Sequence, residues 1–489
     1  MNFRRMLAFA LIFLAACAEM LQAQSWQPLI NQPSFSPSTA LLLTDGTVMV
    51  HDTGAQDWWR LTPDNMGSYV NGTWSQLASL PTGYSPLYYA SAVLPDGRVI
   101  MNGGEYNFGK EAWTTLGAIY SPKTNKWRLV KPPTGWTRIG DAQNVVLPNG
   151  TYMLADCCTV QQALFNSKTL TWTATGTGKA DINDEEGWTL LPDQTVLTVD
   201  ANNTANLTNA EKYIPSTGSW INAGNTIVKL DDTNANNSGS HELGPAVLRP
   251  DGTVFATGAT GFTSVYNPPA NPNDPGTWIQ GPTFPAPGGK QQDIADGPAS
   301  LLPSGNVLVF ASPGVFRTPS KFYEFDGTNL NAVPATPNAV NDSSYYGRML
   351  VLPTGQILFT DTSQDVEIYT AAGSPNPAWA PTITKAPKNV IHARSYLISG
   401  TQFNGLSQGA AYGDDGQSAT NYPLVRITNS ATGHVFYART YNHSTMAVAT
   451  GSAIVSTHFT VPAGIELGAS ELEVVANGIP STAVAVTVQ

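Results

Sequence analysis

The sequence predicts an all-β fold made of seven repeated units, followed by a separate β-rich domain at the carboxyl end. The main observation is a turn-like phrase, Leu-Pro-Asp-Gly in its fullest form, which returns seven times between apolar runs. The copies occupy residues 43–46, 94–97, 147–150, 191–194, 249–252, 302–305 and 352–355. Their last residues are 51, 53, 44, 58, 53 and 50 positions apart. A period near fifty residues indicates a repeat architecture.

Composition supports the same fold class. Charged residues make up 12% of the chain, about half the usual share, and the 489 residues include 44 glycines and 36 prolines. Such a chain is rich in turns and has enough apolar material for a large core. The formal net charge of −11 argues against nucleic acid or an anionic membrane as the main partner, because both call for a basic surface.

Each repeat carries the pattern of four short strands. In the second repeat, an apolar run at 91–94 enters the turn and another at 98–101 leaves it. Asp-Gly or Asn-Gly between apolar runs predicts a hairpin, because glycine accepts the positive φ of such turns. A third run follows at 118–120, and a fourth is built around Trp127. The corresponding positions in other repeats are Trp74, Trp172, Trp220, Trp278, Leu330 and Trp379.

Four strands, a double-glycine-like end of the second strand and a late tryptophan resemble the kelch motif. The resemblance implies a seven-bladed kelch β-propeller over residues 25–385. The run at 25–29 around Trp26 also looks like a fourth strand, although it precedes the first repeat. Either this run or the Trp379 segment completes the last blade, which would close the ring and remove an exposed sheet edge.

Residues 1–24 are predicted to be a signal peptide. Arg4 and Arg5 precede an apolar run at 6–14 that is too short to span a membrane. The sequence Leu-Ala-Ala-Cys resembles a bacterial lipobox, which would leave Cys17 lipidated at the mature amino end. Ordinary cleavage, for example after Ala23, would instead release the protein. We therefore expect an exported protein that is secreted, periplasmic or lipid-anchored at the cell surface.

Two further cysteines, Cys157 and Cys158, are adjacent in the sequence. The interpretation favoured by the sequence is a pair of reduced, partly buried thiols. A vicinal disulfide is the alternative in an oxidising compartment. A zinc site is not predicted, because no second pair of Cys or His lies at ligand spacing.

Residues 386–489 are predicted to form an immunoglobulin-like β-sandwich. Six strand-like runs follow one another at short intervals over about a hundred residues. The region contains no cysteine pair, so the disulfide of antibody domains is excluded.

A kelch propeller followed by such a sandwich resembles galactose oxidase and glyoxal oxidase. Residues 439–444 resemble the loop by which that family places a histidine in the propeller channel, and residues 471–481 resemble its closing strand and turn. The resemblance implies a copper ion held by two tyrosines and two histidines, with one tyrosine crosslinked to a cysteine. Tyr345 and His443 match two of these ligands. Tyr346 stands where the second histidine is expected, and residues 88–90 and 139–141 lack the Cys–Tyr pair.

The family ligands sit at the starts of the innermost strands, eight to ten residues before each turn glycine. Counting back from the turns predicts that carboxylates and tyrosines converge at the propeller mouth. The predicted mouth residues are Tyr88, Tyr89, Asp141, Glu185, Glu186, His241, Glu242, Asp293, Asp296, Tyr345 and Tyr346. Such a ring suits a hard cation such as Ca²⁺, or a sugar that stacks on tyrosines. The alternative is that these acids only satisfy backbone N–H groups and channel water.

The sequence therefore favours a monomeric binding protein for a polar small molecule or glycan, without copper-radical oxidase activity. Nucleic acid is not an expected partner, and a membrane is expected only through the lipid anchor. One alternative is a divergent copper-dependent alcohol or aldehyde oxidase using Tyr345 and His443, and another is a protein-binding surface propeller. The cofactor stays open between copper and calcium, for which Asp414 and Asp415 in a loop of the sandwich are further candidate ligands.

Overall fold

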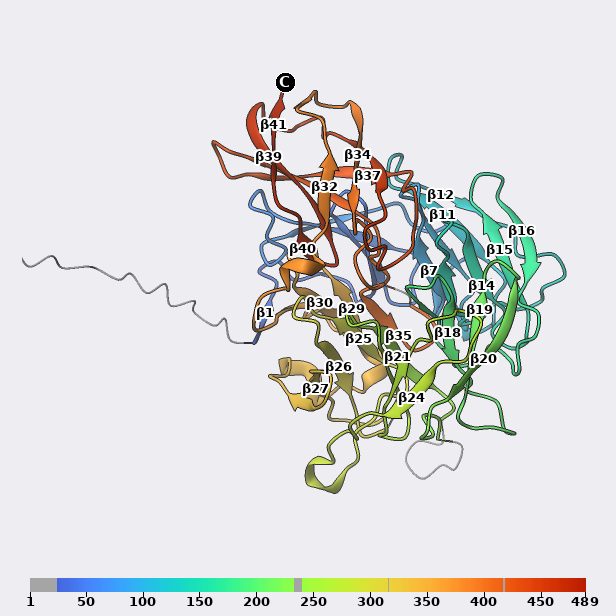
Figure 1. Ribbon diagram of the computed structural model, residues 1–489. Helices are drawn as coiled ribbons and strands as arrows, with labels where there is room; N and C mark the ends of the chain where they lie inside the picture. The colour runs from blue at the N-terminus through green and yellow to red at the C-terminus, as the bar shows by residue number, and fades with distance from the viewer. Residues whose placement is uncertain (1–23, 233–239, 315, 417) are drawn as a thin grey trace, which may run out of the picture.

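The computed structural model describes residues 24–232, 240–314, 316–416 and 418–489 (Figure 1). Within these ranges the chain forms β-strands and four short 3₁₀ helices, so the predicted all-β class is confirmed. Seven of the sheets each contain a run of four antiparallel strands. In one of these seven, the fourth strand comes from the amino end of the described residues. In the described part of the chain, no helix is long and apolar enough to cross a membrane. The lipidation candidate Cys17 lies outside the described residues.

The strands of the seven sheets are as follows, each sheet given from its first to its fourth strand. The first three sheets are β2 (Pro37–Leu42), β3 (Val48–Asp52), β4 (Trp58–Thr62), β5 (Thr73–Gln76); β7 (Ala90–Val93), β8 (Val99–Asn102), β11 (Gly117–Ser121), β12 (Lys126–Leu129); and β13 (Asn144–Val146), β14 (Tyr152–Ala155), β15 (Gln162–Asn166), β16 (Thr171–Thr175). The next two are β17 (Thr189–Leu190), β18 (Val196–Val199), β19 (Asn209–Ile214), β20 (Ser219–Asn225); and β21 (Leu243–Leu248), β22 (Val254–Gly258), β23 (Ser264–Asn267), β24 (Thr277–Gln280). The last two are β25 (Pro298–Leu301), β26 (Val307–Ala311), β27 (Lys321–Phe325), β28 (Leu330–Ala332); and β29 (Arg348–Val351), β30 (Ile357–Thr360), β31 (Glu367–Thr370), β1 (Ser25–Pro28).

Burial falls from the first strand of each sheet to the fourth. β2, β7 and β29 are buried along their whole length, whereas β5 and β12 are largely exposed. First strands also contact one another between sheets, for example β21 with β25, β25 with β29, and β29 with β2. The first strands therefore surround a common centre, and their amino ends converge there.

The repeated phrase forms the turn between the first and second strands. Six of the seven phrases end in a glycine with φ between 77° and 87°, the left-handed region that glycine adopts without a steric penalty. In the fourth phrase Gln194 takes the same conformation at φ 73°, and its N–H still donates to the Leu191 carbonyl at 2.9 Å. The turn geometry is therefore kept even where the glycine is replaced.

The fourth-strand tryptophans join neighbouring sheets. The indole N–H of Trp74 donates to the Asn31 carbonyl at 2.9 Å, and that of Trp127 to the Ala78 carbonyl at 2.8 Å. Trp26 does the same with the Pro334 carbonyl at 2.7 Å, and its strand β1 pairs with β31. The Trp26 segment thus completes the last sheet, whereas Trp379 lies in a 3₁₀ helix (Pro377–Trp379).

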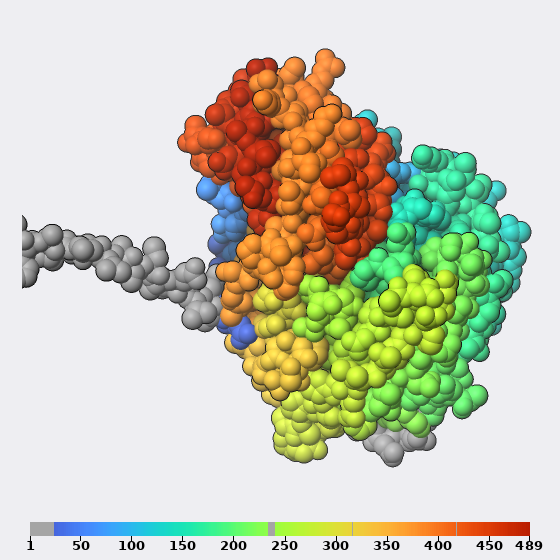
Figure 2. Space-filling view, in the orientation of Figure 1, coloured from blue at the N-terminus to red at the C-terminus, as the bar shows by residue number. Residues whose placement is uncertain are grey.

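The carboxyl-terminal strands form a lobe beside the seven sheets, orange to red in Figures 1 and 2. They are β32 (Thr382–Lys385), β33 (Asn389–Val390), β34 (Ser395–Thr401), β36 (Leu424–Asn429), β37 (Val435–Tyr441), β38 (Val455–Thr460), β39 (Gly468–Ala476), β40 (Ile479–Pro480) and β41 (Val484–Val488). Their own apolar cluster, which includes Ile398, Val425 and Phe459, is separate from the clusters of the seven sheets. Backbone carbonyls of the repeated turns accept hydrogen bonds from this lobe: Thr44 from Thr440, Pro95 from His443 and Pro148 from Met446.

One segment of the lobe enters the centre of the seven sheets. Its strand β35 (Ala410–Tyr412) pairs antiparallel with the first strand β25. The Gly409 carbonyl accepts the Leu301 N–H at 2.7 Å, and the Gln408 side chain accepts the Leu190 N–H at 2.8 Å. The segment therefore runs along the central axis and carries the residues after β35 toward the amino ends of the first strands.

Candidate functional site

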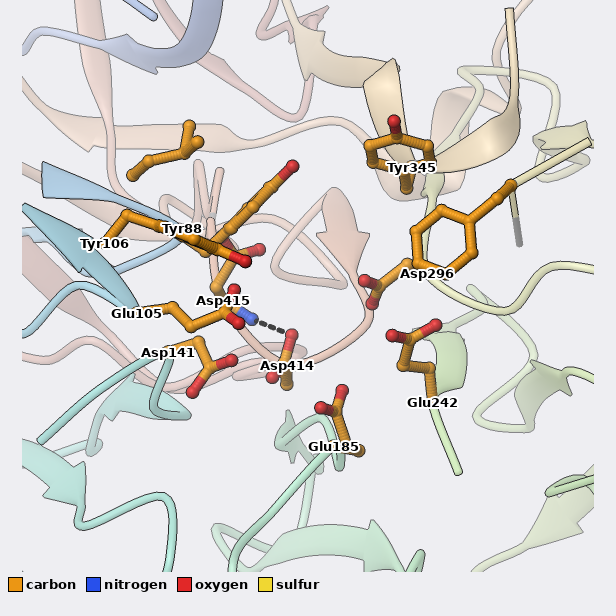
Figure 3. Close-up of a pocket in the computed structure, with 12 residues that line it drawn as sticks. Tyr88, Glu105, Tyr106, Asp141, Glu185, Glu242, Asp296, Tyr345, Asp414 and Asp415 are labelled. Carbon is orange, nitrogen blue, oxygen red and sulfur yellow. Dashed lines mark hydrogen bonds between the residues drawn. The ribbon is translucent and has the colours of Figure 1, made fainter. Parts of the chain in front are cut away.

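A cavity of about 310 Å³ lies at the amino ends of the first strands, opposite the repeated turns. Figure 3 shows Glu105 and Asp141 on one side, Glu242 and Asp296 on the other, and Glu185 and Asp414 between them. Seven of its twelve lining residues are acidic. The full lining is Leu87, Tyr88, Glu105, Tyr106, Asp141, Glu185, Glu242, Asp296, Phe316, Tyr345, Asp414 and Asp415.

The strand starts supply six of these residues, as counting back from the turns predicted. Tyr88, Asp141, Glu185, Glu242, Asp296 and Tyr345 each precede the first strand of a different sheet. Three of them, Tyr88, Glu185 and Asp296, have φ between 52° and 59°. Non-glycine residues seldom adopt this left-handed conformation, and strained residues of this kind cluster at binding sites.

The central segment supplies Asp414 and Asp415. Both are buried, and the Asp415 N–H donates to Oδ1 of Asp414 at 2.7 Å. The segment comes very close to the strand starts here, since a Cβ on Gly413 would lie 2.7 Å from Oδ1 of Asp296. Glycine at this position is therefore what lets the two aspartates reach the cavity.

Five of the carboxylates form two overlapping groups. In one group, single oxygens of Asp141, Glu185 and Asp414 all lie within 4.8 Å of one another. In the other, the same holds for Glu185, Glu242 and Asp296. Glu185 belongs to both groups and links them.

Burial raises the pKa of these carboxyl groups. Burial and the charge of nearby Asp415 raise the pKa of Glu105 to about 7. Burial, followed by the charge of Glu105, raises the pKa of Asp141 to about 8. The pKa is also raised well above its usual value, first by burial and then by neighbouring acids, at Glu185, Asp296 and Asp414. Without a bound cation, these groups are stabilised in their protonated form.

One internal cation lies beside the cavity. Arg348, at the start of β29, has Nη2 3.7 Å from Oδ2 of Asp415, and its guanidinium stacks on Tyr412 at 3.5 Å from the ring centre. Its Nη1 also donates to the Tyr345 carbonyl at 2.8 Å. Arg348 is thus committed to one edge of the cavity and neutralises one carboxylate.

Aromatic rings form the walls above the acids. Tyr88 and Tyr106 pack edge to face, with ring centres 6.2 Å apart. Phe316 packs edge to face on Tyr345, with ring centres 5.4 Å apart. Phe316 is 73% exposed, so its ring is available to a ligand.

Five predicted mouth residues do not line the cavity. Tyr89 is buried, with its hydroxyl 2.9 Å from Nδ1 of His51. Tyr346 packs against Tyr345 in a tilted arrangement, with ring centres 4.2 Å apart, and does not line the cavity. Asp293 is fully buried and exchanges backbone hydrogen bonds with Ser312.

The other two are His241 and Glu186. Nδ1 of His241 lies 4.0 Å from Oδ2 of Asp231, outside the cavity. Glu186 is fully buried 3.2 Å from Nζ of Lys179. Each of these two is adjacent to a residue that does line the cavity, and the side chains of the two neighbours leave the backbone in different directions.

The structure separates the two residues matched to copper ligands. Tyr345 lines the cavity, but the His443 N–H donates to the Pro95 carbonyl in the turn that follows β7. Tyr88 precedes β7, and seven extended residues span roughly 20 Å, so Tyr345 and His443 lie at opposite ends of the first strands. Nδ1 of His443 pairs with the Thr457 hydroxyl at 2.9 Å, and burial lowers its pKa to about 3. The segment that reaches the mouth is the one carrying Asp414.

The donor set of the mouth does not fit the copper centre that the resemblance implies. Among the described residues that line the cavity there is no histidine and no cysteine. The copper centre of that family needs two imidazole nitrogens beside its phenols in a tetragonal set of N and O donors, whereas this lining offers only carboxylate oxygens and phenols.

The two adjacent cysteines form a disulfide, Cys157–Cys158. The expectation of two reduced thiols was therefore wrong. The turn that carries them is fixed by Asn183, whose side chain donates to the carbonyls of Asp156, Thr159 and Gln161. That anchoring holds the two cysteines in one tight turn.

Several lining residues escaped the sequence reasoning. Glu105 and Tyr106 follow the double glycine that ends β8, where Tyr106 begins a small added sheet of β6 (Pro86–Leu87), β9 (Tyr106–Asn107) and β10 (Lys110–Glu111). Phe316 comes from the loop after β26. The double glycine was the one available signal, since it marks where the second strand returns to the mouth.

Comparison with known proteins shows the fold but not a family. No model of a known protein family matches the sequence. The Kelch-like protein terF of Aspergillus terreus is 28% identical over 86 residues, which are 17% of this chain and 18% of that protein. The match thus spans less than a fifth of the curated relative's length.

Solved structures give the wider match. A fungal alcohol oxidase of the AA5 family, solved in complex with copper, has a TM-score of 0.51 at 15% identity and covers 96% of this chain and 100% of its own. Virginiamycin B lyase from Staphylococcus aureus has a TM-score of 0.45 at 11% identity and covers 71% and 99%. Together with the kelch match, the oxidase shows that this chain has a kelch-type β-propeller fold like that of the galactose-oxidase family.

Proposed function

We propose that this protein is an exported, monomeric seven-bladed propeller with an immunoglobulin-like carboxyl-terminal domain, and that it binds a carbohydrate at the propeller mouth without oxidising it. The observation that carries the proposal is the construction of one cavity. Carboxylates form its floor and aromatic rings form opposite walls, Tyr88 with Tyr106 and Tyr345 with Phe316. Sugars are bound in this way, by stacking on aromatic faces while their hydroxyl groups donate to carboxylates.

The oxidase alternative needs a metal held by Tyr345 and His443 together. Those residues lie at opposite ends of the first strands, and Thr457 already binds the His443 ring. No second observation favours the alternative, so we expect no release of peroxide from sugars, alcohols or aldehydes by the copper-loaded protein.

Phe316→Ala is the variant that tests carbohydrate binding. Because Phe316 is 73% exposed, its truncation leaves the fold intact but removes one wall. We expect the wild type to bind a subset of a glycan array and the variant to lose at least tenfold in affinity for those glycans. Phe262→Ala is the matched control, since Phe262 is 40% exposed and does not line the cavity. An array without binding, or equal losses in both variants, would contradict the proposal.

A further inference from the structure

We propose that the floor of the mouth is a centre for two hard divalent cations of the Ca²⁺ type, bridged by Glu185. One cation would lie among Asp141, Glu185 and Asp414, and the other among Glu185, Glu242 and Asp296. The centre lies in the cavity of the proposed function and deepens it, but its test uses the metal alone and does not depend on any glycan.

Distances between the ligand oxygens fit such cations. Ca²⁺ binds oxygen at about 2.3–2.6 Å, so two oxygens on opposite sides of one ion lie roughly 5 Å apart at most. The oxygens of each group lie within 4.8 Å of one another and therefore fit around a single ion. Sharing a carboxylate between two ions is a common feature of two-metal sites.

Unpartnered oxygens in the mouth are a second observation that points to a ligand there. Asp415 is 2% exposed and lines the same cavity, yet within the described ranges its Oδ1 has no hydrogen-bond partner. The buried Oδ1 atoms of Asp141 and Asp296 likewise have none among the described residues. Buried polar atoms in folded proteins are nearly always bonded, so three unpartnered acceptors on residues that line one cavity favour a donor or cation there.

Charge indicates how many ions are needed. The five ligands of the two groups carry five negative charges when ionised, and Arg348 is engaged with Asp415, which belongs to neither group. Two divalent cations reduce this charge to −1, whereas one would leave −3 in a site partly shielded from water. All the ligands are carboxylates. Carboxylate oxygens suit Ca²⁺, Mg²⁺ and Mn²⁺ better than they suit softer metals.

Calcium titration by isothermal calorimetry, on protein stripped with EDTA and dialysed, tests the centre. We expect a saturable signal with two ions per chain for the wild type. Glu185→Gln removes the charge of the shared ligand without changing its size, and we expect at least tenfold weaker binding at both sites. Unfolding temperature measured in EDTA shows that the variant is folded, since a neutral Gln removes the cost of charging or protonating this carboxyl and leaves the metal-free protein at least as stable as the wild type.

Two control variants separate the ligands from general charge effects. Asp293→Asn removes a more deeply buried carboxylate outside both groups, and Glu111→Gln removes an exposed one on β10. Both are expected to bind calcium as the wild type does. The proposal fails if the wild type binds no calcium, binds one ion per chain, or if Glu185→Gln binds as well as the two controls. If the protein binds calcium but no glycan, only the carbohydrate proposal is contradicted. If it binds a glycan but no calcium, only the two-cation proposal is contradicted.

Discussion

Two acidic clusters lie next to each other along the chain, and they balance their charge in different ways. Glu186 belongs to an inner cluster with Asp181, Asp200 and Glu211, where Nζ of Lys179 lies within 3.5 Å of all four carboxylates. Its neighbour Glu185 belongs to the mouth, where Arg348 lies 3.7 Å from Asp415 and forms no ion pair within 4 Å with another carboxylate of the described residues.

The difference shows why a group of acids alone does not indicate a metal site. Oxygens of Asp181, Asp200 and Glu211 also lie within 4.8 Å of one another, as in the mouth. However, a buried ammonium already occupies the position that a metal would take. The mouth lacks such an ammonium among the residues described, and it is open to solvent, so its cation has to come from outside.

Removing the inner cation should have the largest effect. Lys179→Met leaves four buried carboxylates without their shared partner, and breaking a buried ion pair from one side typically costs about 3–5 kcal/mol. We expect a loss of that size in the free energy of unfolding, measured by urea titration. Lys126→Met on the exposed strand β12 is the control. A loss below about 1 kcal/mol would show that the inner cluster does not depend on Lys179.

Arg348→Met should have the next largest effect. The guanidinium is 5% exposed at the side chain and donates to the carbonyls of Tyr345 and Gly347 as well as facing Asp415. Leaving such acceptors unpaired costs about 1–3 kcal/mol. We expect that decrease in urea unfolding without calcium, and we expect added calcium to restore part of it. If calcium restores nothing, the mouth does not use external cations to offset its charge.

Glu185→Gln should raise the free energy of unfolding in the absence of calcium, whereas the two preceding substitutions lower it. In EDTA the wild-type carboxyl either stays charged among other acids or takes up a proton at a cost, because burial and neighbouring acids raise its pKa, and a neutral Gln removes that cost. We expect the variant to be more stable than the wild type by on the order of 1 kcal/mol in EDTA, and less stable in saturating calcium. Identical unfolding curves for Glu185→Gln and the wild type, both in EDTA and in saturating calcium, would contradict the contrast between the two clusters.

The smallest expected effect is a change in pH dependence at Glu105. Burial raises its pKa to about 7 in the folded protein, above the value of about 4.5 in the unfolded chain. The folded state therefore binds more protons between these values, so this group stabilises the protein at low pH and the contribution is lost as pH rises through 7. Unfolding in EDTA at pH 5 and pH 8 should show a smaller decrease for Glu105→Gln than for the wild type. A steeper decrease in stability between pH 5 and pH 8 for Glu105→Gln than for the wild type would contradict the raised pKa of Glu105.

Periodicity was sufficient to predict the repeats, and counting back from the turns located six lining residues. The count located the right stretch of chain but could not predict which way each side chain points. It therefore could not tell Glu185 from Glu186, or Tyr88 from Tyr89. Tyr88 and Glu185 both have a left-handed backbone conformation, and their side chains line the mouth while those of Tyr89 and Glu186 are buried in the interior.

Residues delivered from distant segments were harder to predict. Asp414 and Asp415 lie more than a hundred positions from the turn after β25, and only the pairing of β35 with that strand brings them to the mouth. The resemblance to copper oxidases pointed instead to His443, which the structure places at the turn face. No local pattern encodes which loop of the second domain follows the central axis.

Diffraction from a crystal grown with MnCl₂, measured at a wavelength where manganese scatters anomalously, tests the contrast between the two clusters most directly. The account predicts two anomalous peaks in the mouth, on either side of the Glu185 carboxylate, and none beside Lys179. An empty mouth, or a peak among Asp181, Asp200 and Glu211, would contradict it.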